Sequence, residues 1–113
     1  MPIPPQEKLR TLCLTLPGAT EVTMKRGPSY RVGGRIFAWD RQADCSATVW
    51  LKVPDGIQAV LVGSDPERFF VPPYVGPKGW VGLRLDGGTD WGEVEVLVER
   101  SYRLIAPRGA ERS

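Results

Sequence analysis

Histidine is absent from this 113-residue sequence, which removes the side chain that most often serves as a general acid or base near neutral pH. The same absence removes the side chain that most often binds metal ions in proteins. The two cysteines, Cys13 and Cys45, have no Cys-x-x-Cys spacing and belong to no larger framework, so we expect free thiols. The sequence therefore predicts no metal site and no other cofactor.

Other catalytic patterns are missing as well. The serines have no histidine to activate them, and neither cysteine has a recognisable base beside it. The segment Gly76-Pro77-Lys78-Gly79 is not a phosphate-binding P-loop, because Trp80 follows where a hydroxyl residue is required. Carboxylates near predicted turns or a helix start favour local hydrogen bonds, and these are Asp40, Asp44, Asp86 and Asp90. We expect no catalytic residues and a binding protein rather than an enzyme.

Long apolar runs and a large charge excess are lacking too. No run approaches the roughly 20 residues that a membrane-spanning helix needs, and the first residues lack the layout of a secretory signal. We expect a soluble, cytoplasmic monomer without membrane contact. The net charge is only +2, from 15 lysines and arginines against 13 aspartates and glutamates. Total charge alone therefore does not argue for nucleic acid as the partner.

The residues that are present suffice for one globular domain spanning residues 1–113, since 42% of them are hydrophobic and 25% charged. Apolar residues at three- and four-residue spacing predict an amphipathic helix over 6–16. A short second helix is predicted over 57–63. A third runs from Asp90 to about residue 106, because Asp90 and Glu93 have the spacing of a capping box. We expect its buried face to hold Trp91, Val94, Leu97, Val98, Leu104 and Ile105.

Alternation of side chains predicts the strands. Four short extended runs precede the second helix, over 21–23, 29–32, 35–40 and 47–53, with a polar loop over 41–46. Gly33-Gly34 forms a tight hairpin turn, and Gly76–Gly79 reverses the chain between extended arms at 69–75 and 80–85. The order is helix, four strands, helix, two strands, helix. It predicts an α+β fold in which an antiparallel sheet of five to six strands packs against helices in two layers.

One face of this sheet is expected to gather aromatic and basic side chains. The aliphatic residues alternate along 47–53 and 80–85 and should face the helices, which leaves their neighbours on the opposite face. If the hairpin turn holds only the two glycines, Tyr30 lies opposite Phe37 and both join that face. It would then hold Tyr30, Arg35, Phe37, Trp39, Trp50, Lys52, Trp80 and Arg84.

Rings interspersed with cations suit nucleic acid or a planar ligand, since bases stack on aromatic side chains while arginine and lysine contact phosphate. The candidate nucleic-acid-binding residues are Arg31, Arg35, Trp50, Lys52, Lys78, Trp80 and Arg84. The candidate residues for a small ligand are Tyr30, Trp39 and Tyr74. The alternative is that the 69–78 loop or the third helix covers these rings, which would then form a second small core.

Several segments together resemble the MmcQ/YjbR family of small bacterial proteins. They are Leu12–Gly18, Tyr30–Ala38, Leu51-Lys52, Asp65–Trp80, and Asp90-Trp91 with Ser101–Pro107, so the resemblance extends over nearly the whole chain. It implies a compact α+β fold similar to CyaY or to a double wing, and a DNA-binding role. The chain departs from many relatives in lacking histidine. It also has Lys25-Arg26-Gly27 where an aromatic residue or a histidine often accompanies the glycine.

Three kinds of function therefore stay open. The leading hypothesis is weak, non-enzymatic DNA binding without strong sequence specificity. A module that binds a small ligand or another protein through the aromatic and basic face is the alternative. An enzyme of unrecognised type is the third.

Overall fold

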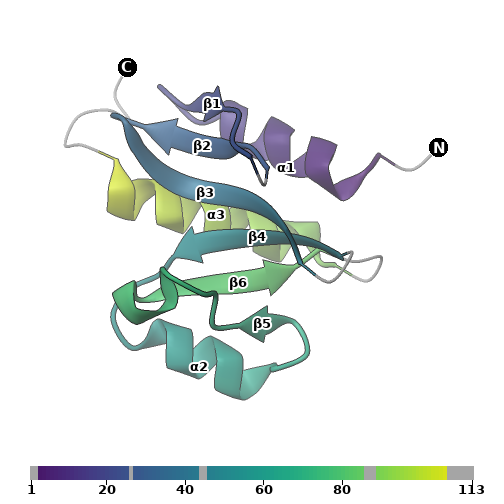
Figure 1. Ribbon diagram of the computed structural model, residues 1–113, viewed down its shortest axis with the longest axis vertical. Helices are drawn as coiled ribbons and strands as arrows, with labels where there is room; N and C mark the ends of the chain where they lie inside the picture. Colours follow the sequence, from purple (N-terminus) through teal and green to yellow (C-terminus); the bar gives the residue numbers. More distant parts are fainter. Residues whose placement is uncertain (1–2, 26, 44–45, 86–88, 107–113) are drawn as a thin grey trace.

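The computed structural model describes residues 3–25, 27–43, 46–85 and 89–106 (Figure 1). In chain order its elements are α1 (Pro5–Leu14), β1 (Thr20–Val22), β2 (Ser29–Val32), β3 (Arg35–Ala43), β4 (Ser46–Lys52), α2 (Ile57–Ser64), β5 (Phe69–Phe70), the 3-10 turn η1 (Gly76–Lys78), β6 (Trp80–Arg84) and α3 (Trp91–Ile105). This order of helices and strands confirms the α+β prediction.

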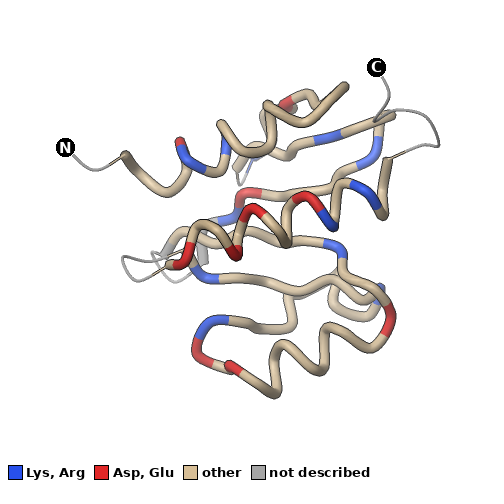
Figure 2. The backbone as a smooth tube through the Cα atoms, turned by 180° about the vertical axis from the view of Figure 1, so that it is seen from behind, with Lys and Arg blue, Asp and Glu red and all other residues tan. Residues whose placement is uncertain are grey.

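The six strands form one antiparallel sheet in the order β1-β2-β3-β4-β6-β5. Helices α1 and α3 lie together on one face, behind the sheet in Figure 1 and in front of it in Figure 2. The shorter α2 lies beside the β5 edge (Figure 1). The central strands are therefore covered by described helices on one face, which gives the predicted two layers.

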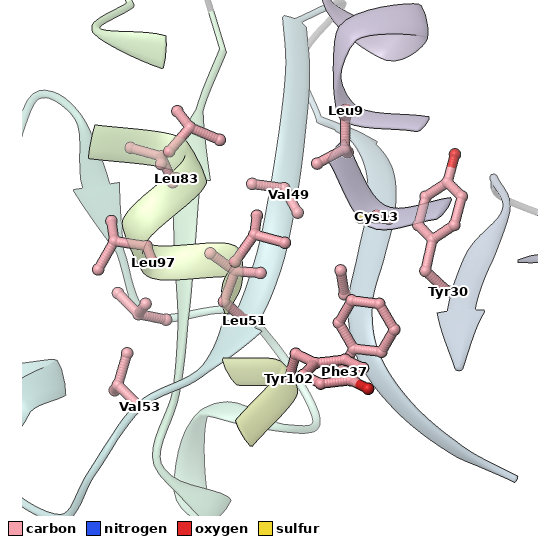
Figure 3. Close-up of a cluster of buried hydrophobic side chains, with 14 of the residues drawn as sticks. Leu9, Cys13, Tyr30, Phe37, Val49, Leu51, Val53, Leu83, Leu97 and Tyr102 are labelled. Carbon is pink, nitrogen blue, oxygen red and sulfur yellow. The ribbon is translucent and has the colours of Figure 1, made fainter. Parts of the chain in front are cut away.

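The core fills the space between the sheet and its two covering helices (Figure 3). Phe37 of β3 meets Tyr102 of α3 edge to face, with ring centroids 5.3 Å apart. Burying each aliphatic side chain contributes about 1.5–3 kcal/mol. The largest fully buried side chains are Tyr30, Tyr102, Phe37, Leu9, Leu51, Leu83, Val32, Val49, Val53, Val81, Val94 and Val98.

Helix α3 begins as predicted, because the Asp90 carboxylate accepts hydrogen bonds from the backbone N–H groups of Gly92 and Glu93. Its buried face differs at the end of the helix. Ser101 and Tyr102 are buried there, whereas Leu104 is exposed. Trp91 is half-buried and packs at the margin of the core, so its predicted burial is only partial.

Ser101 joins α3 to two neighbouring strands. Its hydroxyl donates to the carbonyl of Phe37 at 2.5 Å and accepts the N–H of Lys52 at 2.9 Å. The last backbone pair of β3 and β4 at this end is Ala38 with Leu51, so the pairing stops just short of Phe37 and Lys52. The serine hydroxyl thus replaces the bond that Phe37 and Lys52 would otherwise make with each other.

Two predicted boundaries are wrong. The polar segment 41–46 was expected to be a loop, but β3 continues to Ala43 and β4 begins at Ser46. The pairs Arg41 with Thr48 and Gln42 with Ala47 extend the ladder there, so backbone pairing overrides the polar composition. The extended arm 69–75 is only the two-residue β5, because the prolines after Val71 have no N–H to offer a neighbouring strand.

The structure bears on three further predictions, which concern the cysteines, the aspartates near turns and membrane-spanning helices. Cys13 is a buried free thiol, while Cys45 and Arg26 lie outside the described residues. Asp40 was placed near a turn but is a buried residue of β3, and Asp44 and Asp86 also lie outside the described part. Within the described ranges, no helix has the length and apolar character needed to cross a membrane.

Candidate functional site

The strand register defines the face of the sheet turned away from α1 and α3. Trp39 pairs with Trp50, which in turn pairs with Gly82, so these residues share one face. Ala38, Leu51 and Val81 form the adjacent row and are buried in the core, so the row of Trp50 points the other way. We call this surface the outer face. Its described members on β2 to β6 are Ser29, Arg31, Ile36, Trp39, Arg41, Thr48, Trp50, Lys52, Phe70, Trp80, Gly82 and Arg84.

The centre of the outer face is a cluster of two indoles and a guanidinium. The rings of Trp39 and Trp50 meet edge to face with centroids 5.6 Å apart. The guanidinium carbon of Arg41 lies 4.6 Å from the first ring and 4.4 Å from the second. Such contacts combine ring packing with cation–π attraction. As a result Trp50 is only 3% exposed and cannot offer a ring face to a ligand without rearrangement.

The same cluster is rich in hydrogen-bond donors. The Nε1 atoms of Trp39 and Trp50 are both buried, and neither has a hydrogen-bond partner among the described atoms. An indole N–H can only donate, and a guanidinium likewise has donors and no acceptor. The chemistry available here therefore matches an acceptor, such as water or an anionic oxygen.

Phe70 and Arg84 extend the face toward the β5 edge. A Cβ placed on Gly82 would lie 2.2 Å from the Phe70 ring, so the ring rests directly on the strand. The Arg84 guanidinium carbon is 4.7 Å from the centre of that ring, and its Nη1 donates to the Glu67 carbonyl at 3.1 Å. Both side chains are half-buried. These contacts position the Arg84 charge at the surface.

Lys52, Trp80 and the loop around Lys78 complete the face. Lys52 pairs with Trp80 across the ladder, and both side chains are half-buried. The Lys52 ammonium donates to the carbonyl of Lys78, whose own side chain is exposed. Tyr74, in the same connection, is 79% exposed. The predicted residues Lys52, Lys78, Trp80 and Tyr74 are therefore brought to one end of the sheet.

Charge is distributed unequally between the two sides of the sheet. The described strands have two carboxylates, Glu21 and Asp40, and each pairs with a core residue and so lies on the helix side. Four cations, by contrast, belong to the outer face: Arg31, Arg41, Lys52 and Arg84. Figure 2 shows further acidic positions along α3, seen from the helix side. A net charge of only +2 thus conceals a basic outer face.

Three predicted residues of this face are on the other side. A β-bulge shifts the β2–β3 register, so Tyr30 pairs with Ala38 instead of Phe37. Tyr30 is 1% exposed in the core, and burial, reinforced by the Glu21 charge, raises the pKa of its phenol. Phe37 is fully buried as well. Arg35 pairs with Val32, a core residue, and is exposed beside the hairpin turn on the helix side.

Two more predicted site residues, Arg31 and Trp39, lie on the outer face, and two residues that contribute to the site were missed. Arg31 lies on β2, where its Nε donates to the Ser29 hydroxyl at 3.1 Å. Trp39 is on the outer face as predicted, half-buried against Arg41. Arg41 itself was missed because the predicted strand stopped at Asp40. Its spacing of two from Trp39 would have placed it correctly in a longer strand. Phe70 was missed because nothing in the sequence fixes the β5–β6 register.

A carboxyl group is buried on the helix side, apart from the outer face. Asp40 is 6% exposed, and burial, with a smaller effect of the Glu21 charge, raises its pKa to about 6. Burial likewise raises the pKa of the nearby Cys13 thiol. Glu21 forms an ion pair with Arg10 at 2.9 Å. In the described part of the chain, no group of three potential ligands could hold a metal ion.

Comparison with known proteins shows to which family this chain is related. No curated protein matches it. A similar solved structure is the crystal structure of Deinococcus radiodurans protein DR2400, which has a DUF419 domain. The two chains are 25% identical, the match covers 96% of this chain and 88% of that one, and the TM-score is 0.80. The YjbR family model matches residues 14–104. The chain therefore belongs to the YjbR family.

Proposed function

We propose that this protein binds nucleic acid, with DNA as the leading candidate, through the outer face. Binding is weak, has little sequence specificity and involves no catalysis. The observation that carries the proposal is the charge distribution: the outer face has four cations, while both carboxylates of the described strands lie on the helix side. Phosphate contacts need such a surface and carry no sequence information.

We propose Lys52, Arg84 and Arg31 as the residues that contact phosphate. Lys52 and Arg84 are half-buried, so their charges are held in place by neighbours yet remain accessible. Arg31 adds a third accessible cation at the β2 end. Contact with about three phosphates by such residues predicts a log–log salt slope of roughly −2 to −3. We propose that the protein acts in the cytoplasm as a monomer.

The test is fluorescence anisotropy of labelled single- and double-stranded oligonucleotides, titrated from low to physiological salt. Arg84→Gln should weaken binding to every sequence and make the salt slope shallower by about one. Arg35→Gln is the matched control, because it removes an exposed arginine from the helix side and should change neither quantity. No binding by the parent protein at about 100 μM and low salt would refute the proposal, since non-specific binders register there.

A further inference from the structure

The connection between β5 and β6 presents one large ring to solvent. Tyr74 is 79% exposed, whereas Trp50 is 3% exposed and the other rings of the outer face, Trp39, Phe70 and Trp80, are half-buried. Among the described aromatic side chains, Tyr74 thus has the most accessible ring. A base that stacks on this protein needs an open ring of this kind.

The backbone at Tyr74 is strained. Its φ is 66°, a value that glycine adopts readily and a bulky residue rarely does. The N–H of Val75 donates to the carbonyl of Pro73 at 2.7 Å, so Tyr74 is the central residue of a γ-turn of the positive-φ form. Such a conformation persists only where its surroundings hold it, and strained residues concentrate at sites of recognition.

The surroundings of Tyr74 are held firmly. The side-chain amide of Gln58 on α2 donates to the carbonyls of Gly76 and Trp80, at 2.8 and 2.5 Å. The N–H of Gly76 donates to the Pro72 carbonyl at 3.0 Å. Figure 1 shows this connection crossing the start of β6 on the side of the outer face. The exposed ring therefore lies in a connection that Gln58 holds in place, and the same connection reaches the Lys52 ammonium through the carbonyl of Lys78.

We propose that Tyr74 is the residue on which an unstacked base lies, so that the protein prefers single-stranded over double-stranded nucleic acid. The inference rests on the proposed function, because it assigns the cations of the outer face to the phosphates. Phosphate contacts are available in both kinds of nucleic acid. A base inside a duplex is already stacked on its neighbours, so only a single strand can use the ring.

The test replaces Tyr74 with glycine, which removes the ring but adopts a positive φ without strain. Anisotropy titrations compare a single strand, the matching duplex and a strand of the same length made of abasic nucleotides. Stacking of one base is worth about fivefold in affinity or more. We expect Tyr74→Gly to lose that factor on the normal single strand and to bind the duplex and the abasic strand like the parent. Tyr74→Phe keeps the ring and should bind like the parent throughout.

The outcomes separate this inference from the proposed function. If the parent binds and Tyr74→Gly binds the normal single strand equally well, the role of Tyr74 is refuted while nucleic-acid binding stands. Equal losses on all three probes would also refute stacking, because the ring would then act on the backbone or the fold. If the parent binds none of the probes, both proposals fail. Thermal melts show that each variant is folded, and Tyr74→Gly should melt no lower than the parent.

Discussion

The buried carboxyl of Asp40 should make the stability of this protein depend on pH. Burial raises its pKa from 3.8 to about 6, which corresponds to about 3 kcal/mol. The folded state favours the protonated form, so it binds a proton more tightly than the unfolded state. This contribution to stability is fully present below about pH 4 and is lost as the pH rises through about 6.

Replacement of Asp40 by asparagine removes this titration and keeps a neutral side chain of similar shape. We expect the free energy of unfolding of Asp40→Asn, relative to the parent, to rise by about 2–2.5 kcal/mol between pH 4 and pH 7. Other titratable groups are common to both proteins, so their contributions largely cancel in the difference. The measurement is urea unfolding followed by tryptophan fluorescence at intervals from pH 4 to pH 8.

A control variant and a direct titration distinguish the effect of the Asp40 pKa from the loss of one negative charge. Asp55→Asn removes an exposed carboxyl from the turn after β4 and serves as the control for loss of one negative charge. The Asp40 carboxyl can also be titrated directly by carbon NMR. A stability difference between Asp40→Asn and the parent that stays constant from pH 4 to pH 8 would show that this carboxyl is not desolvated, and the reasoning would fail.

Three substitutions test the packing around the candidate site, each by urea unfolding. Gly82→Ala places a methyl group 2.2 Å from the Phe70 ring, so we expect a loss of about 1–3 kcal/mol, and an unchanged midpoint would contradict the ring's position. Ser101→Ala removes the hydroxyl that bridges β3 and β4 and should cost about 1–3 kcal/mol, whereas Ser64→Ala, at an exposed position of α2, should cost much less. Trp50→Ala should cost about 3–5 kcal/mol, and a stability equal to the parent's would mean the indole is not buried.

The fold could be predicted from local signals that agree with one another. The capping carboxylate of Asp90, the Gly33-Gly34 turn and the alternation in β4 and β6 each correspond to an element of the structure. The β2–β3 register could not be predicted, because the bulge that shifts it depends on how the strand packs against other elements. Phe37 turns toward Tyr102 of α3, and the sequence of β3 alone contains no sign of that partner.

The candidate site was predicted less completely for a related reason. Alternation correctly assigned Trp50 and Lys52 to the outer face, since it needs only the strand period. It could not tell that Arg41 would lie across the indole of Trp50 and leave it almost unexposed. The exposure of a side chain depends on neighbours from other strands. The sequence of one strand therefore predicts which face a side chain is on, but not how accessible that side chain is.

The two edges of the sheet are unusually short, with three residues in β1 and two in β5. An edge strand offers unpaired N–H and C=O groups to which a foreign strand can add, and long edges are a route to aggregation. Here α2 lies beside β5, and prolines follow that strand within three residues (Figure 1). Copies of the chain brought close together, as on a shared polymer, would find little backbone on which to fuse their sheets into fibres.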